Sequence, residues 1–367
     1  MQKTVVHLIA AARPNFMKVA PLYHALKATD WCRPLVVHTG QHYDFNMSDA
    51  FFRDLGLPVP EFHLGVGSGS HAEQTGGVMI AYEKICTEHR PDWIVVVGDV
   101  NSTAACAMVG AKLWIPVVHL EAGLRSGDRR MPEEINRLVT DAIADVLWTP
   151  SADADENLVR EGVSRDKIDL IGNIMIDSFE LLRDRIDSSS SRSDLRLEET
   201  DYALLTLHRP SNVDQQDTLA AIVNALESIA PDLRLVFVSH PRTIKNLRNF
   251  GLLDQLNSID NFDLLQPLPY IDFMNIVTGA RLVITDSGGL QEETTYLGIP
   301  CLTMRENTER PITVTQGTNK LAAAADLPGE VRAILHGDWK KGSCPPLWDG
   351  QAAGRAVRSL QKRLRRF

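Results

Sequence analysis

The chain has 367 residues, more than one hydrophobic core usually serves, so we expect two domains. Its 44% hydrophobic and 23% charged residues are typical of an ordinary soluble globular protein. The formal net charge of −9 argues against nucleic acid as a partner, and no apolar stretch is long enough to predict a membrane span. Five cysteines without CxxC or CxxH spacing indicate neither a disulfide framework nor a zinc site, and we expect a cytoplasmic protein.

Short apolar runs alternate with helical stretches over the first part of the chain. The runs have the length of strands, and the stretches between them have helical periodicity or helix-forming composition. This alternation predicts a parallel sheet with helices on both faces. The predicted strands span residues 5–9, 35–38, 94–99, 116–121 and 146–149, and the predicted helices span 16–27, 103–113 and 132–144.

The same alternation starts again after residue 200 and predicts a second doubly wound α/β domain. Between the two series lies 187–194, a polar, serine-rich insert that is typical of a flexible surface loop. We place the domain change near residues 172–176, which gives an N-terminal domain of 1–172 and a C-terminal domain of 173–350. Residues 351–367 predict an amphipathic helix with a basic, solvated face, packed back on the N-terminal domain. The second series of strands spans 202–207, 235–238, 262–265, 282–285 and 300–303.

One strand–turn–helix junction of the second domain has a composition suited to a phosphate group. An apolar run at 282–284 is followed by Asp-Ser-Gly-Gly at 286–289 and by helix-forming residues. Free backbone N–H groups at a helix start attract an anion, and glycine lets the backbone approach it closely. Glu292 and Glu293 follow one turn later, where one could accept hydrogen bonds from a ribose. The alternative is an ordinary α/β junction, since the full dinucleotide fingerprint is absent.

Further polar side chains fall at the carboxyl ends of predicted strands or at a helix start. Doubly wound sheets bind ligands at these strand ends, and we expect the two domains to face each other across a cleft there. Taken singly, the carboxylates could cap helices, the cations could be solvated and the histidines could be structural. Together they could clamp a diphosphate and move protons beside it. The set comprises Arg13, Lys18, Asp99, Glu121, Glu133, His208, Arg209, His240 and Asp286.

All of these residues except His240 lie within short motifs spread over nearly the whole chain. The motifs are ARPNFMK at 12–18, GD at 98–99, HLEAGLRS at 119–126, MPEEINR at 131–137, LHRP at 207–210, DSGGLQEE at 286–293 and ERP at 309–311. In order and spacing they resemble the motifs of the non-hydrolysing UDP-N-acetylglucosamine 2-epimerases. The blocks around Glu121, around Glu133 and from Asp286 to Pro311 are the most specific.

The resemblance implies a fold, a reaction and partners. The family has two Rossmann-like domains similar to those of the GT-B glycosyltransferases, with UDP held mainly by the second. It interconverts UDP-N-acetylglucosamine and UDP-N-acetylmannosamine, a precursor of surface polysaccharide, by losing UDP and the carbon 2 proton to form 2-acetamidoglucal. Protonation of the opposite face and return of UDP complete the inversion. The family is commonly homodimeric and uses neither metal nor nicotinamide, so the resemblance implies no cofactor.

Matched motif by motif, the resemblance also implies roles for residues of this chain. Asp99 and Glu121 are expected to exchange the carbon 2 proton, and Glu133 to support them. His208 is expected to stabilise the departing phosphate. The expected substrate contacts are Arg13, Lys18, Arg209, His240, Leu268, Phe273, Ser287, Gly288, Gly289, Glu293 and Arg310.

A second site and several other functions remain open at the level of sequence. Gln41 and His42, together with Arg209 and His240, match a site at which substrate activates some bacterial members of the family. Neighbouring positions lack the Gln and Arg expected there. The alternative functions are epimerisation of another UDP-linked acetamido sugar, a hydrolysing epimerase that releases free N-acetylmannosamine, a UDP-sugar glycosyltransferase, and a non-catalytic nucleotide-sugar-binding protein.

Overall fold

The computed structural model describes residues 3–40, 52 and 54–364, so the predicted positions Gln41 and His42 lie outside the described residues. The chain divides into two compact units, Met1–Leu181 with Pro346–Phe367, and Leu182–Pro345. The division falls within α7 (Ile174–Asp187), after Leu181. The first turns of α7 belong to the first unit because Asp177 accepts backbone hydrogen bonds from Ala352 (3.0 Å) and Ala353 (2.8 Å). Among the described residues, no helix is both long and apolar enough to cross a membrane.

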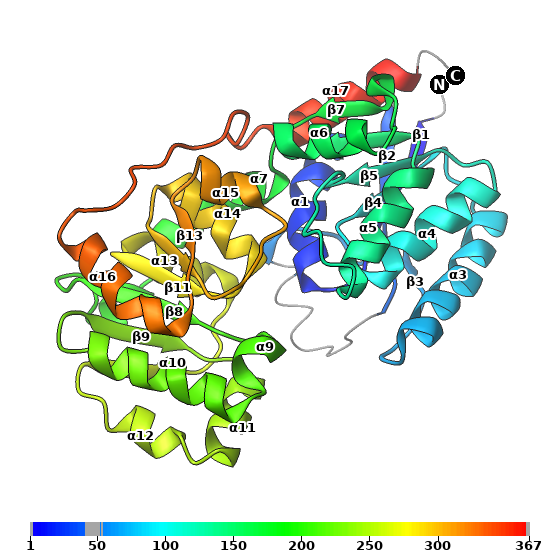
Figure 1. The fold of residues 1–367 in the computed structure, drawn as a ribbon. Helices are drawn as coiled ribbons and strands as arrows, with labels where there is room; N and C mark the ends of the chain where they lie inside the picture. Colours follow the sequence, from blue (N-terminus) through cyan, green and yellow to red (C-terminus); the bar gives the residue numbers. More distant parts are fainter. Residues whose placement is uncertain (1–2, 41–51, 53, 365–367) are drawn as a thin grey trace. The chain divides into compact units, whose positions relative to one another are not determined.

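The first unit is built around a seven-stranded sheet in the order β3-β2-β1-β4-β5-β6-β7 (Figure 1). Every strand pair is parallel. The chain builds outward from β1 in one direction and then in the other, so the strand order switches between β1 and β4, where such sheets bind ligands. The strands are β1 (Thr4–Ala10), β2 (Cys32–His38), β3 (Phe62–His63), β4 (Trp93–Val97), β5 (Val117–Leu120), β6 (Val146–Thr149) and β7 (Ile168–Leu170).

Helices cover both faces of this sheet, which is why its central strands are largely apolar. Ile94 and Val96 of β4 pack in one core with residues of α3 and α4. On the other face, the Trp148 indole of β6 donates a 2.8 Å hydrogen bond to Ser359 of α17. The helices are α1 (Arg13–Lys27), α3 (His71–Glu88), α4 (Asn101–Lys112), α5 (Pro132–Ile143), α6 (Ala152–Arg160), α7, the short η1 (Arg165–Lys167) and α17 (Ala352–Leu364).

The second unit repeats the arrangement with a six-stranded sheet in the order β10-β9-β8-β11-β12-β13. All of its strand pairs are parallel too. The strand order switches between β8 and β11, so the ends of these two strands mark the expected ligand position. The strands are β8 (Tyr202–Thr206), β9 (Arg234–Val238), β10 (Phe262–Leu265), β11 (Leu282–Thr285), β12 (Cys301–Thr303) and β13 (Asn319–Leu321).

Alternate residues of β8 point to opposite faces of the second sheet. Ala203 and Leu205 pack in a core with α10 and α16, whereas the Tyr202 hydroxyl donates to the Ile276 carbonyl of α13 (2.5 Å). Figure 1 shows α10 on one side of the sheet and α13 and α14 on the other. The helices are α8 (Ser191–Asp194), α9 (Pro210–Val213), α10 (Gln216–Ile229), α11 (Pro241–Asn249), α12 (Leu253–Asn257), α13 (Tyr270–Gly279), α14 (Gly288–Leu297), α15 (Pro311–Thr315), η2 (Ala324–Asp326) and α16 (Leu327–Leu335).

Two local predictions were wrong. The insert 187–194 is not a flexible loop: α8 forms within it, Ser190 donates to the Asp194 carboxylate (2.7 Å), and the Arg192 N–H donates to Asn275 (3.1 Å). Serine and aspartate satisfy backbone groups locally, which stabilises a single helical turn. Residues 288–289 are not part of the turn but begin α14, with Ser287 as its N-cap.

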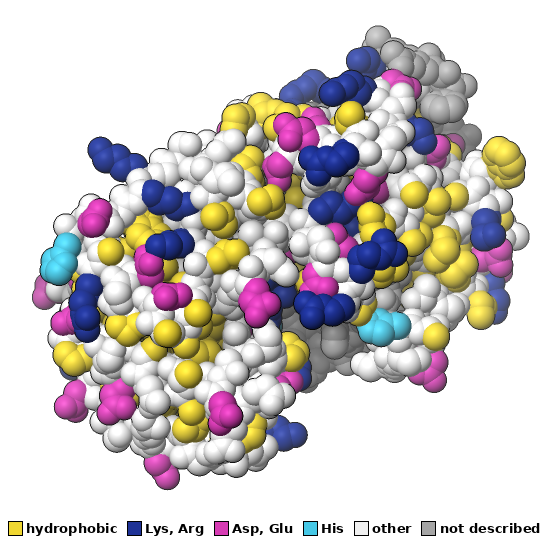
Figure 2. All heavy atoms as spheres, in the orientation of Figure 1, with side chains coloured by type: hydrophobic (Ala, Val, Ile, Leu, Met, Phe, Trp, Pro, Cys, Tyr) yellow, Lys and Arg dark blue, Asp and Glu magenta, His cyan; other side chains and the backbone are white. Residues whose placement is uncertain are grey.

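Several large hydrophobic side chains of the first unit are exposed. Ile80 of α3 is 62% exposed and Trp114, after α4, is 89% exposed. Ile135 and Val139, one turn apart on α5, are also exposed. Figure 2 shows hydrophobic side chains gathered on the surface over α4 and α5. A large exposed apolar area of this kind is typical of a surface that another molecule covers.

Candidate functional site

Asp99 and Glu121 follow the carboxyl ends of two neighbouring strands. Val97, the last residue of β4, pairs with Leu120, the last residue of β5. Beyond the strands, the Gly98 N–H donates to the Leu120 carbonyl (3.1 Å), so the two turns remain joined. Both carboxylates therefore leave the same edge of the first sheet, and β4 borders the switch point.

Glu121 is buried and forms an ion pair with Lys18 of α1. The Lys18 ammonium contacts Oε2, whereas Oε1 is buried and has no hydrogen-bond partner among the described residues. Glu121 also has a backbone φ of 71°, in the left-handed region that costs a side-chain-bearing residue about 1–2 kcal/mol. A buried unpaired carboxylate oxygen on a strained backbone is typical of a functional position. Lys18 is thus not a solvated surface cation.

Asp99 is held by a residue that the sequence analysis missed. Arg137 of α5 donates to Oδ2 of Asp99 from Nε (3.0 Å) and Nη2 (2.8 Å), while Oδ1 accepts no hydrogen bond from the part of the chain that the structure describes. Arg137 is buried and also contacts Glu134. Its place three residues after Glu134, on the same helix face, is the signal that could have identified it.

The two adjacent glutamates of α5 have different surroundings. Glu134 is buried and accepts hydrogen bonds from the backbone N–H groups of Ser126 and Gly127, both at 3.0 Å. It therefore holds the loop that precedes α5. Glu133 is half-buried and makes no hydrogen bond to another described residue, so its carboxylate is available to a ligand or to water. Neither is the N-cap, which is Met131.

The loop after β1 lies at the same sheet edge. The Asn15 carboxamide accepts from the Ala12 N–H (3.0 Å) and donates to the Val97 carbonyl (3.0 Å). This residue thereby joins the start of α1 to the end of β4, across the switch point. Arg13 is the first residue of α1 and directly follows this loop.

In the second unit, Asp286 organises the turn that carries His208 and Arg209. Asp286 follows β11 and is fully buried. Its carboxylate accepts from the backbone N–H of His208 (3.0 Å) and of Arg209 (2.8 Å), from the His208 ring (2.9 Å) and from the Asn212 side chain (3.0 Å). Burial raises the pKa of Asp286, but hydrogen bonding and charge from His208 outweigh it, so this pKa lies below its usual value. Asp286 is thus not the N-cap of α14.

The start of α14 packs closely against an arginine held by two carboxylates. Arg310 is buried and contacts Glu292 (2.8 Å from Nε) and Glu309 (2.6 Å from Nη1). A Cβ on Gly288 would lie 2.6 Å from Oε1 of Glu309 and 3.1 Å from Nη1 of Arg310. A larger residue there would displace the Glu309 carboxylate and the Arg310 guanidinium, whereas glycine lets the helix start pack beside them. This combination can bind a phosphate.

Glu293, one turn into α14, is paired with a tyrosine that the sequence analysis missed. The Tyr270 hydroxyl, at the start of α13, donates to Oε1 of Glu293 at 2.6 Å. Burial raises the pKa of Glu293 to about 7, against this hydrogen bond and together with the charge of Glu292. The expected uracil contacts, Leu268 and Phe273, are half-buried and flank Tyr270 in sequence.

His240 lies near His208 but belongs to a different strand end. It follows β9 and is the N-cap of α11, where its Nδ1 accepts from the Arg242 N–H (3.2 Å). The two imidazole rings have centroids 6.0 Å apart. Burial lowers the pKa of His240, and the neighbouring His208 and Arg242 lower it further.

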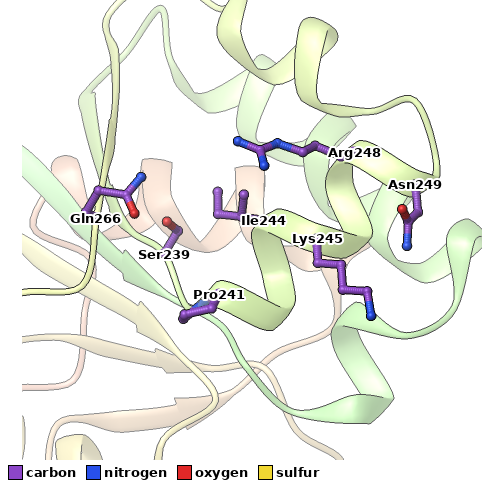
Figure 3. A pocket seen from close by; sticks show the side chains of 7 residues that line it. All are labelled: Ser239, Pro241, Ile244, Lys245, Arg248, Asn249 and Gln266. Carbon is purple, nitrogen blue, oxygen red and sulfur yellow. The ribbon is translucent and has the colours of Figure 1, made fainter.

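A pocket of about 310 Å³ lies beside His240, at the ends of β9 and β10. None of the predicted site residues lines it, although Ser239 and Pro241 flank His240 in sequence. Figure 3 shows Arg248 reaching over Ile244 toward Gln266. The pocket is thus a neighbour of the predicted site and not part of it. Its lining residues are Ser239, Pro241, Ile244, Lys245, Arg248, Asn249 and Gln266.

The predicted residues therefore form two groups, one at the carboxyl edge of each sheet. The first group combines carboxylates with cations, and the second combines a helix start with an arginine and an Asp–His pair. No set of three or more His, Cys, Asp or Glu side chains within the described ranges is arranged to hold a metal ion. The first group contains Lys18, Asp99, Glu121 and Glu133, and the second contains His208, Arg209, His240, Ser287, Gly288, Gly289, Glu293 and Arg310.

Comparison with known proteins gives consistent matches along the chain. The family model of UDP-N-acetylglucosamine 2-epimerase matches residues 24–361. The UDP-N-acetylglucosamine 2-epimerase of Methanocaldococcus jannaschii is 41% identical over 364 residues, which cover 96% of this chain and 98% of that protein. The UDP-2,3-diacetamido-2,3-dideoxy-D-glucuronate 2-epimerase of Pseudomonas aeruginosa is 39% identical, again over 96% and 98%. A crystal structure of the M. jannaschii enzyme with UDP-GlcNAc and UDP has a TM-score of 0.88 and covers 98% of this chain and 100% of that one.

Proposed function

The chain belongs to the UDP-N-acetylglucosamine 2-epimerase family, and we propose that it interconverts UDP-N-acetylglucosamine and UDP-N-acetylmannosamine. One observation carries the proposal beyond family membership. Asp99 and Glu121 follow adjacent strands, and each has one carboxylate oxygen bound to a cation and the other without a described partner. Inversion at carbon 2 needs two groups that exchange a proton, and this pair supplies them.

The proposed reaction begins with loss of UDP, because the carbon 2 proton is barely acidic in the intact substrate. The bond between carbon 1 and the phosphate oxygen breaks, and its electron pair leaves with UDP. One carboxylate takes the carbon 2 proton, and the C–H electron pair forms the double bond of 2-acetamidoglucal. The other carboxylate protonates the opposite face, and UDP oxygen bonds again to carbon 1. We assign these two roles to Asp99 and Glu121, with Glu133 supporting them.

The second unit supplies the groups proposed to hold UDP as it leaves and returns. The start of α14 and Arg310 suit the diphosphate because both present N–H donors to it. His208 donates from Nδ1 to Asp286, which leaves Nε2 to face the departing phosphate. The buried carboxylate of Glu293 suits a ribose hydroxyl, and Leu268 and Phe273 are assigned to uracil.

Proton NMR of the purified protein with UDP-N-acetylglucosamine in heavy water tests the proposal, with no metal or cofactor added. We expect UDP-N-acetylmannosamine to appear with deuterium at carbon 2, because the proton is exchanged through the carboxylates. Free UDP with free N-acetylmannosamine would instead assign the chain to the hydrolysing epimerases. An unchanged spectrum would contradict the proposed substrate.

A second candidate substrate follows from one relative. The P. aeruginosa protein, which is 39% identical, is named as an epimerase of a diacetamido glucuronate. A direct comparison of kcat/KM on that UDP-linked uronate and on UDP-N-acetylglucosamine decides between the two. We favour UDP-N-acetylglucosamine because the M. jannaschii relative, at 41% identity, is named for this substrate. Its product would then serve as a precursor of surface polysaccharide.

We also propose that the protein is a homodimer. The exposed side chains of Ile80, Ile135 and Val139 lie on helices of the first unit, and burying them against a second copy would remove them from water. Light scattering coupled to size-exclusion chromatography measures the mass directly. The double variant Ile135→Lys/Val139→Lys should have the mass of a single chain. A wild-type protein with the mass of a single chain would overturn this proposal.

A further inference from the structure

His119 lies close in sequence to Glu121 and contacts the turn that carries Asp99, but it has no role in the proposed reaction. It is the third residue of β5, two positions before Glu121, and its ring is fully buried. Nδ1 lies 2.6 Å from Oδ1 of Asp141, and Nε2 lies 2.8 Å from the Gly98 carbonyl oxygen. A carboxylate and a carbonyl can only accept hydrogen bonds, so both ring nitrogens must donate. A ring with two N–H groups carries a positive charge.

We propose that His119 is an imidazolium whose two hydrogen bonds set the relative position of Asp99 and Glu121. It is a positioning residue and does not contact the substrate. The charge assignment stands on geometry alone, whereas the catalytic consequence rests on the proposed epimerase function.

The charged groups around Asp141 explain how a charged histidine can be buried. The second oxygen of Asp141 contacts Nη2 of Arg125 at 2.8 Å and accepts from the Gly123 N–H at 3.0 Å. Burial raises the pKa of Asp141, but the charges and hydrogen bonds of His119 and Arg125 outweigh it, and its pKa lies below the usual value. Arg125 in turn pairs with Glu161 (2.6 Å). Two cations thus face two carboxylates, so no charge is buried without a partner.

The same cluster reaches the backbone of both turns that carry the candidate proton-transfer groups. His119 binds the carbonyl of Gly98, the residue before Asp99. Asp141 binds the N–H of Gly123, two residues after Glu121. Both glycines have positive φ, 68° and 81°, which the hydrogen bonds hold in place. One buried ion pair therefore links the two turns.

The two turns are packed differently, so loss of this link would shift one relative to the other. A Cβ on Gly123 would lie 2.4 Å from the Ala154 carbonyl, so that turn is packed directly against α6. A Cβ on Gly98 would lie 3.6 Å from both the Lys18 ammonium and the Glu121 carboxylate. A small shift of the Gly98 carbonyl would therefore move the Asp99 turn relative to the Lys18–Glu121 pair. Proton transfer is sensitive to such shifts, and about 1 Å of misplacement can cost about 100-fold in rate.

Nitrogen NMR of the histidine-labelled wild-type protein tests the charge without any turnover. His7 is the internal reference: it is fully buried in β1 of the same sheet, its Nδ1 lies 3.1 Å from the Tyr82 hydroxyl, and burial lowers its pKa to about 4. At neutral pH we expect both nitrogens of His119 to show protonated shifts and His7 to show those of a neutral ring. The His119→Gln and His7→Gln variants assign the signals. A neutral His119 ring at this pH would overturn the proposal, whatever the protein's activity proves to be.

Kinetics of His119→Gln test the positioning role. Glutamine can keep one of the two hydrogen bonds but not both, and it carries no charge. We expect kcat to fall by about 100-fold while KM and UDP affinity stay within about threefold, because the second unit is unchanged. His7→Gln should keep wild-type kcat. A wild-type kcat in His119→Gln, or an equal loss in both variants, would overturn the role.

Discussion

Nδ1 of His208 lies 2.9 Å from Oδ1 of Asp286, a carboxylate with no exposure to solvent. The two residues follow different strands, β8 and β11, that border the switch point of the second sheet. Asp286 also accepts the backbone N–H of His208, so it orients both the ring and the turn that carries it. A histidine held in this way presents Nε2 in a defined direction, as a group that stabilises a leaving phosphate requires.

Asp286→Asn should therefore damage catalysis through His208. An asparagine can turn its NH₂ group toward Nδ1, which favours the wrong tautomer of the ring. We expect kcat to fall by about 100-fold or more. UDP affinity, measured by calorimetry, should fall much less, because Arg310 and α14 remain in place. An unchanged kcat would contradict the orienting role of Asp286.

The same substitution should alter acid stability. The folded-state pKa of Asp286 lies below the value of 3.8 for a free aspartate. A depressed pKa stabilises the fold at every pH above the unfolded value, and this contribution is lost as pH falls through the folded value. Wild type should therefore exceed Asp286→Asn in unfolding free energy at pH 7, by about 2 kcal/mol. The gap should close below pH 3.8, as urea unfolding at several pH values measures.

Asp99→Asn should abolish turnover but keep UDP binding. The change removes a candidate base and leaves the second unit untouched. We expect kcat to fall by about 1,000-fold and the Kd for UDP to change by less than about twofold. Asp30→Asn, at an exposed position after α1, is the matched control and should behave as wild type. Loss of UDP binding in Asp99→Asn would argue against the assigned role.

Glu293 should make the second unit less stable as pH rises. Its folded-state pKa is about 7, against 4.5 for a free glutamate. A raised pKa contributes stability that is complete below 4.5 and is lost as pH rises through 7. Relative to Glu293→Gln, wild type should lose on the order of 3 kcal/mol over this window. Hydrogen exchange of α14 in urea measures the unfolding free energy of the second unit separately from the first. If this free energy depends on pH in the same way in wild type and Glu293→Gln, the prediction is refuted.

Gly288→Ala should weaken UDP binding by displacing Arg310. The added Cβ would meet Oε1 of Glu309 at 2.6 Å, and such overpacking costs about 1–3 kcal/mol. We expect the Kd for UDP to rise by about tenfold or more. Gly329→Ala is the control: it lies in the first turn of α16, where a Cβ meets nothing within 4 Å. The Gly329→Ala variant should bind UDP with wild-type affinity. Equal UDP affinities of Gly288→Ala and Gly329→Ala would contradict the proposed role of Arg310 and the start of α14 in binding the diphosphate.

Much of the fold could be predicted because strand and helix signals are local. The fully buried runs of β4, β5 and β11 are short and mostly apolar, and glycine or a polar residue follows them. Such runs alternating with helical segments allow few arrangements other than parallel, doubly wound sheets. The carboxyl ends of parallel strands share an edge, which is why Asp99 and Glu121 could be placed together from their positions alone.

The local predictions that were wrong concern segments whose structure depends on side-chain contacts with distant residues. The serine-rich insert at 187–194 has the composition of a loop, yet hydrogen bonds to Asp272 and Asn275 of α13 order it. No local signal predicts those partners, because they are more than 80 residues away along the chain. Gly288 and Gly289 are poor helix formers, but they begin α14, and at Gly288 a Cβ would meet Glu309 and Arg310.

The sequence by itself therefore determined the two doubly wound domains, the family and the strand ends at which reactive groups stand. Tertiary structure alone decided which oxygen of each carboxylate is paired, that Arg137 holds Asp99, and that Tyr270 meets Glu293. Periodicity reports which face of an element is buried, but it does not report the direction of one side chain toward another. That direction depends on residues far apart in the chain, and it sets the protonation and geometry of the site.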